Sequence, residues 1–189
     1  MASDLTHSRV SPASWVLLGL LTTVLVGSLP GDASGQEVSS VKAAFLYNFA
    51  KFAEWPALPP GDPIVFCIIG DEGIAAALVP MVRGQNISGH ALDVRRSQDG
   101  GTWVACQLLF IADAETRRLA APLGTVKAQP VLTVSDGNGF AQAAGIIELY
   151  VENGRMHFAI NVEALDRSRL RLSSRLLGLA KIVKTRQGQ

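Results

Sequence analysis

The sequence contains few of the side chains that enzymes use for catalysis. It has three histidines and two cysteines among 189 residues, and only His90 and His157 lie beyond residue 35. Neither histidine belongs to a cluster of metal ligands, and the chain has no HExxH, GxSxG or Walker A pattern. The turn at 70–73 lacks the third glycine and the spacing of a dinucleotide-binding loop. We therefore expect no catalytic residues, no bound metal and no cofactor.

A strong charge of one sign is also missing. The formal net charge is +1, and no stretch interleaves basic with aromatic residues. This balance argues against nucleic acid as a partner. Long apolar runs are scarce as well, since only 15–29 stands out and it is shorter than the roughly 20 residues that a spanning helix needs. We expect no direct membrane insertion of the chain after this run.

The first 35 residues have the order of a secretory signal. Arg9 precedes the apolar run, and small residues at Ala33 and Gly35 suit cleavage before Gln36. An uncleaved N-terminal anchor is the alternative. The remaining residues 36–189 are near the common size of one domain, so we expect a single exported domain.

Both cysteines, Cys67 and Cys106, follow this leader. An oxidising compartment favours their joining, and closing a loop of about 40 residues would stabilise the fold by about 4 kcal/mol. Two free buried thiols are the alternative. No CxxC spacing is present, which argues against a thioredoxin-like redox catalyst and against a zinc site.

The segment Val41–Pro56 is the most informative part of the chain. It reads VKAAFLYNFAKFAEWP, and Phe45, Phe49 and Phe52 fall at helical spacing on one face. A second apolar strip beside them consists of Ala43, Leu46, Ala50 and Ala53. A helix covered only by solvent would not carry this much apolar surface. The helix is therefore either packed between a sheet and another helix or shared with a partner chain.

Strands and short helices alternate along the middle of the chain. Apolar runs and turn signals predict strands at 64–69, 90–95, 106–111 and 131–134. The first and third are apolar throughout, as in strands buried on both faces of a parallel sheet. Helices are expected at 74–82, interrupted near Pro80, and at 116–123, and a loop is expected at 83–89. This order predicts a layered α/β fold.

The clearest local signal is the Asn-Gly pair at 153–154. It lies between two alternating runs, which predicts a β-hairpin with a two-residue type I′ turn. The register then places Val151 opposite Met156 and Tyr150 opposite His157. Further along, we expect a polar turn at 166–169 and a helix capped by Ser173 or Ser174, with an inward stripe of Leu176, Leu179, Ala180 and Val183.

Loops that follow the predicted parallel strands should meet at one edge of the sheet. Ligands bind at this edge in open α/β sheets. Asp71, Asp113, Gly137 and Asn138 are therefore candidate ligand residues. The alternative is that the glycine and asparagine simply form turns.

Several blocks of the sequence resemble the YfiR family of periplasmic proteins. They are the helix at 41–56 with its Trp55-Pro56 end, the hairpin that leads through 157–161, and the closing segment from Leu172 to Val183. The similarity spans nearly all of residues 38–184.

The resemblance implies a three-layer α/β sandwich with a largely parallel central sheet, a C-terminal β-hairpin and a helix. It also implies a periplasmic homodimer that represses a membrane-anchored diguanylate cyclase by binding the periplasmic sensor region of that enzyme. Cys67 and Cys106 are similar in position to one disulfide of the family, whereas a second pair found in some relatives is absent. The bond is therefore either a redox switch or only structural.

Two functions follow from the sequence. The first is regulation by protein contact, with Phe45, Phe49 and Phe52 at an interface with the partner or a second copy. The alternative is a periplasmic sensor that binds a small molecule at the rim near Asp71, Asp113 and Gly137. An exported enzyme ranks third, because the chain lacks catalytic groups.

Overall fold

The structure is a computed structural model, and it describes residues 33–96, 103–119 and 123–186. Residues 1–32 of the leader predicted at 1–35 lie outside the described residues. Its cleavage, the export of the chain and the division at residue 36 therefore stay predictions.

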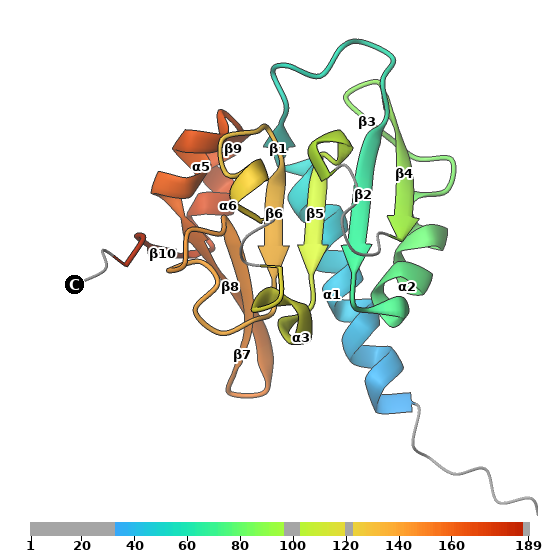
Figure 1. Ribbon diagram of the computed structural model, residues 1–189. Helices are drawn as coiled ribbons and strands as arrows, with labels where there is room; N and C mark the ends of the chain where they lie inside the picture. The colour runs from blue at the N-terminus through green and yellow to red at the C-terminus, as the bar shows by residue number, and fades with distance from the viewer. Residues whose placement is uncertain (1–32, 97–102, 120–122, 187–189) are drawn as a thin grey trace, which may run out of the picture. The chain divides into compact units, whose positions relative to one another are not determined.

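A largely parallel sheet forms the centre of the described fold, as Figure 1 shows. Eight strands lie in the order β10-β8-β7-β6-β5-β2-β4-β3. Their bounds are β2 Ile64–Ile69, β3 Asn86–Ile87, β4 His90–Arg96, β5 Leu108–Ile111, β6 Leu132–Ser135, β7 Ile147–Glu152, β8 Arg155–Asn161 and β10 Lys181–Val183. The β3–β4 and β7–β8 pairs are antiparallel, and the other neighbouring pairs are parallel.

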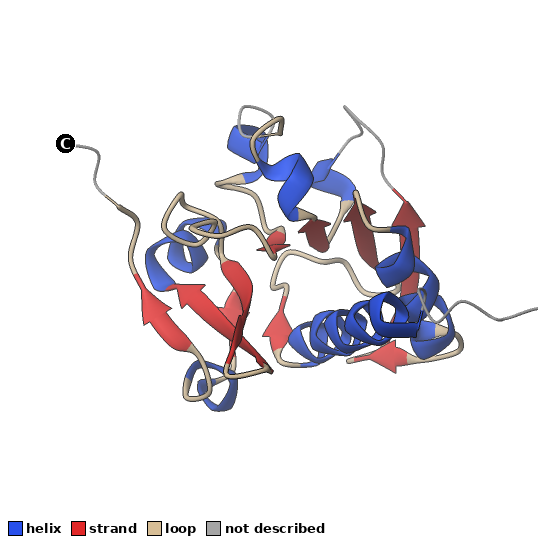
Figure 2. Cartoon of the chain, turned by 90° about the horizontal axis from the view of Figure 1, so that it is seen from below, coloured by secondary structure: helices blue, strands red, loops and turns tan. Residues whose placement is uncertain are grey.

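Helices cover both faces of this sheet, which confirms the predicted three-layer sandwich. Helices α1 (Ala33–Lys51) and α2 (Glu72–Val82) lie on one face, and the short η1 (Trp103–Ala105), α3 (Asp113–Thr116) and η2 (Gly124–Val126) lie on the other, as Figure 2 shows. Successive side chains of a strand point to opposite faces. In β2, Phe66 and Ile68 therefore join the core under α1, whereas Cys67 joins the second core.

The hairpin forms with the predicted register. Val151 pairs with Met156, and Tyr150 pairs with His157. The turn residues at 153–154 both have positive φ values, 51° and 73°, as a type I′ turn requires.

The chain after the hairpin differs from the prediction. The polar turn expected at 166–169 is the end of a helix, α5 (Val162–Ser168), which begins at Asn161 because that side chain accepts a hydrogen bond from the Ala164 amide. A two-stranded sheet then joins β1 (Ala53–Glu54) to β9 (Arg171–Leu172).

The long C-terminal helix was also a wrong prediction. Ser173 does cap a helix, but α6 (Ser174–Leu177) ends at Gly178. Residues 181–183 instead form β10, which pairs with β8, so Leu179 does not face inward and is 71% exposed. The open edge of β8 supplies backbone partners here, and these outweigh an apolar spacing that suits a helix.

Three smaller predictions in the middle of the chain need correction. Helix α2 continues through Pro80 without interruption. Proline has no amide hydrogen to donate to the carbonyl of Ala76, one turn earlier, but both residues are exposed, so that carbonyl can bind water instead. The loop expected at 83–89 contains β3. Of the helix expected at 116–123, Thr116 is the end of α3, residues 117–119 form a turn, and residues 120–122 lie outside the described residues.

Candidate functional site

The outer side of α1 carries an apolar groove, and this is the first candidate site. Its volume is about 420 Å³. The lining comes from α1, β8 and the α6 region and comprises Val41, Ala44, Phe45, Asn48, Phe49, Phe52, Phe158, Arg175, Leu176 and Leu179. Only Asn48 and Arg175 among these are polar. A groove of this composition favours an apolar occupant, because water gains few hydrogen bonds inside it.

The three phenylalanines predicted at an interface differ in burial. Phe49 is 1% exposed, and its ring centroid lies 5.1 Å from that of Phe158 on β8. The Phe45 ring packs against the same pair at steep angles, with its centroid 5.9 Å from that of Phe49 and 6.0 Å from that of Phe158. Phe45 and Phe52 are only partly buried and form the wall of the groove. One strip of α1 is thus core, and its flank faces outward. The partner role of these residues stays a prediction.

Two further features give the groove its character. Val41 and Leu179 are large apolar side chains that remain exposed at its border. Arg175 is exposed beside them and forms no ion pair with any residue that the structure describes. The groove therefore combines an apolar floor with one free positive charge.

The rim at the carboxyl ends of the strands is the second region that the sequence singled out. Asp71 accepts a hydrogen bond from the Ile74 amide at 2.9 Å and so caps α2. This is a structural role at the start of a helix. Asp71 does not line either of the two pockets described here.

A single carboxylate connects the other rim loops. The Oδ1 atom of Asp136 accepts a hydrogen bond from the Asp113 amide at 2.8 Å, and its Oδ2 atom lies 2.5 Å from the Nζ atom of Lys42 on α1. A Cβ atom added to Gly137 would meet the Asp113 carboxylate at 3.0 Å, so the loops after β5 and β6 are in close contact. The predicted grouping holds for Asp113 and Gly137.

A pocket of about 310 Å³ opens next to this rim. Gly137 and Asn138 line it, whereas Asp113 does not. Its polar lining adds Thr116, Arg117, Lys127 and Thr133, and its larger apolar residues are Leu123, Val126, Val131, Phe140 and Ile146. We call this the rim pocket.

Small residues keep the rim pocket open. Glycine or alanine occupies six of its lining positions, which are 137, 139, 143, 144, 145 and 164. At Gly145 an added Cβ would lie 2.1 Å from the Phe140 ring, so any side chain here would displace that ring. Thr133 Oγ1 already accepts a hydrogen bond from the Ile146 amide, and Glu148 accepts one from the amide of the lining residue Gly139.

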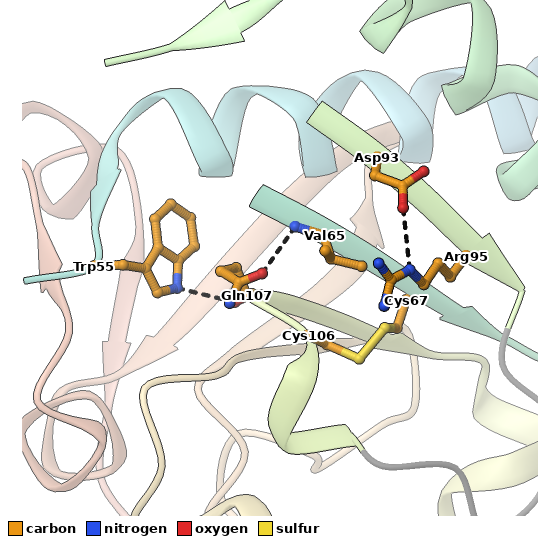
Figure 3. Close-up of a disulfide and its surroundings, with 7 residues drawn as sticks. All are labelled: Trp55, Val65, Cys67, Asp93, Arg95, Cys106 and Gln107. Atoms are coloured by element: carbon orange, nitrogen blue, oxygen red, sulfur yellow. Dashed lines mark hydrogen bonds and ion pairs between the residues drawn. A yellow bond between two sulfur atoms is a disulfide. The ribbon is translucent and has the colours of Figure 1, made fainter. Parts of the chain in front are cut away.

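The disulfide predicted between Cys67 and Cys106 is present, with the Cα atoms 5.8 Å apart (Figure 3). It joins the middle of β2 to the segment before β5. Next to it, Gln107 extends the pairing of these strands, because its Oε1 atom accepts from the Val65 amide at 2.9 Å. The Gln107 carbonyl also accepts from the Trp55 indole at 3.0 Å. The disulfide therefore links β2 to the segment that leads into β5, its neighbouring strand in the middle of the sheet.

The two histidines that the structure describes, His90 and His157, sit in structural surroundings. The Nδ1 atom of His90 lies 2.7 Å from the Asp62 carbonyl oxygen, and His157 stacks on Tyr150 across the hairpin. Within the described ranges, no group of three or more His, Cys, Asp or Glu side chains could hold a metal ion. The same ranges contain no helix with the length and apolar character needed to cross a membrane.

Four basic residues were missed by the sequence reasoning. They are Lys42, which holds Asp136, Arg175 at the groove, and Arg117 and Lys127 at the rim pocket. Their spacing in the sequence gives no signal, because each residue lies on a different segment and reaches its site only in the folded chain.

Comparisons with known proteins agree with the resemblance seen in the sequence. A search of curated proteins gave no match. The model of the YfiR/HmsC-like family matches residues 39–181, which include α1 from Ser39 onward, the sheet up to the start of β10, and the disulfide. This family is periplasmic and regulatory, and it is associated with cyclic di-GMP signalling. Because the match covers most of the sequence, the chain belongs to the YfiR/HmsC-like family.

Proposed function

We propose that this protein acts in the periplasm and represses a membrane-anchored diguanylate cyclase by binding its periplasmic sensor region. Family membership supports a regulatory role in cyclic di-GMP signalling. The observation that carries the choice of surface is the groove beside α1, where the exposed side chains of Val41 and Leu179 border an apolar cavity of about 420 Å³.

The groove provides enough apolar surface for a protein contact. Leu179 is 71% exposed and Val41 is 39% exposed. Fully burying a side chain of this kind contributes about 1.5–3 kcal/mol. A few such residues at the centre of an interface usually supply most of the binding energy.

The groove also defines the chemistry of its occupant. Amphipathic helices bind apolar grooves through residues spaced three or four positions apart. We expect the sensor region to offer such a helix, with an acidic side chain placed to meet Arg175, since a charge-assisted hydrogen bond fixes the orientation of the partner.

Binding of the purified exported protein to the isolated sensor region, measured by calorimetry, tests this proposal. Leu179→Glu and Arg175→Glu should each weaken binding by at least tenfold and raise cyclic di-GMP in cells. Val104→Glu is the matched control, because Val104 is 48% exposed on η1, on the opposite face of the sheet. Equal affinity of Leu179→Glu and Val104→Glu would contradict the proposal.

The homodimer implied by the family resemblance is a second, separate proposal. Light scattering of the wild-type protein gives its mass in solution. If the groove binds a second copy instead of the cyclase, Leu179→Glu should convert a dimer to a monomer and leave the cyclase affinity unchanged.

A further inference from the structure

The rim pocket is distinct from the groove used in the proposed function. Its wall residues Val126 and Val131 belong to the core on the second face of the sheet, whereas the groove lies against α1 on the first. The volume of about 310 Å³ is within the usual range for small-molecule sites.

The interior of the pocket favours an apolar body. Val126, Val131, Phe140 and Ile146 are all buried and line it. Thr133, which lies beside them, already accepts a hydrogen bond from the Ile146 amide through its Oγ1 atom. A polar group placed at this depth would lose its hydrogen bonds to water without replacement.

The charges around the pocket favour an anionic head group. Arg117 and Lys127 both line it and are exposed, and neither forms an ion pair with the residues described by the structure. No aspartate or glutamate lines the pocket. A guanidinium binds a carboxylate through two parallel hydrogen bonds, and a lysine adds a point charge.

We propose that the rim pocket binds a small monocarboxylate with an apolar chain, with the carboxylate at Arg117 and Lys127 and the chain against Val126 and Val131. This inference goes beyond the proposed function, because it concerns the isolated protein and requires no cyclase.

Calorimetric titration of the purified exported protein with sodium octanoate tests the inference. Octanoate should bind saturably and at least tenfold more tightly than acetate, which lacks the chain, or octanamide and octylamine, which lack the negative charge. Absence of saturable octanoate binding up to 10 mM, a concentration we set for this test, would overturn the inference. Octylamine or acetate binding as tightly as octanoate would also overturn it.

Variants locate the binding. The double variant Arg117→Gln, Lys127→Gln should weaken octanoate by at least tenfold and leave octanamide unchanged. The charge-matched control is Arg155→Gln, Lys184→Gln, since both residues are exposed and neither lines the pocket. Ala143→Trp, at an exposed lining position, should block the mouth and abolish binding in a protein whose circular dichroism is unchanged. Full affinity in either pocket variant would refute the assignment. None of these results depends on the cyclase, so a failure here is separate from a failure of the proposed function.

Discussion

Breaking the Cys67–Cys106 bond should lower the free energy of unfolding by about 4 kcal/mol. The two cysteines are 39 positions apart. In the chain-entropy model, closing a loop of this length removes about 13 cal/mol/K from the unfolded chain, which is about 4 kcal/mol at 25 °C. For a domain of this size, the midpoint of thermal unfolding should fall by roughly 8–16 °C, at about 2–4 °C for each kcal/mol.

Urea unfolding followed by tryptophan fluorescence measures this loss. Trp103 is a suitable reporter because it is buried in the same core as the disulfide. Trp55 is a second reporter, since its indole donates a hydrogen bond to the carbonyl of Gln107, the residue after Cys106. Comparing oxidised with reduced wild-type protein isolates the loop closure, since both sulfur atoms stay in place. The double variant Cys67→Ala, Cys106→Ala should lose slightly more, because each substitution also removes a buried sulfur atom.

The structure also predicts how fast the bond can be reduced. The cysteines are 4% and 3% exposed, so a reductant reaches the sulfur atoms only when the sheet opens locally. A difference below about 1 kcal/mol between oxidised and reduced protein would refute the entropic reasoning. Complete reduction within seconds under native conditions would refute the buried placement.

Two more substitutions test the packing around the candidate sites. Phe49→Ala should lower the free energy of unfolding in urea by about 3–5 kcal/mol, because Phe49 is fully buried. Phe52→Ala should lower it less, because Phe52 is only partly buried. Equal losses would contradict the assignment of Phe49 to the core. Asn161→Ala should cost about 3 kcal/mol, since Asn161 caps α5 and donates to Ala141 and Thr185. Asn161→Ser keeps a capping oxygen without adding a charge and should lose only part of this. Equal losses for the two Asn161 variants would show that the cap contributes little.

The central sheet could be predicted because its signals are local. β2 and β5 are apolar throughout, and burial on both faces of a sheet requires this pattern. The hairpin register follows from two turn residues that tolerate positive φ. The contacts of Phe49 also follow from its spacing on α1, because a strip this apolar must be covered.

The C-terminal segment could not be predicted in the same way. Leu176, Leu179 and Val183 have a helical spacing, but the free edge of β8 decides that 181–183 becomes a strand. Helix α5 left a readable signal, since Asn161 followed by Glu163 is a recognised start of a helix. The rim pocket left none, because Arg117 and Lys127 lie in the connection between β5 and β6, whereas the residues that complete the pocket come from the segment after β6.

The ion pair between Lys42 and Asp136 physically links the groove beside α1 to the rim pocket. Asp136 immediately precedes the pocket residues Gly137 and Asn138, and Lys42 immediately follows the groove residue Val41. A displacement of the loop must therefore move α1 or break this contact. If α1 follows the loop, a molecule that favours one loop position changes the affinity of the groove, and the occupant of the groove changes the affinity of the pocket by the same factor.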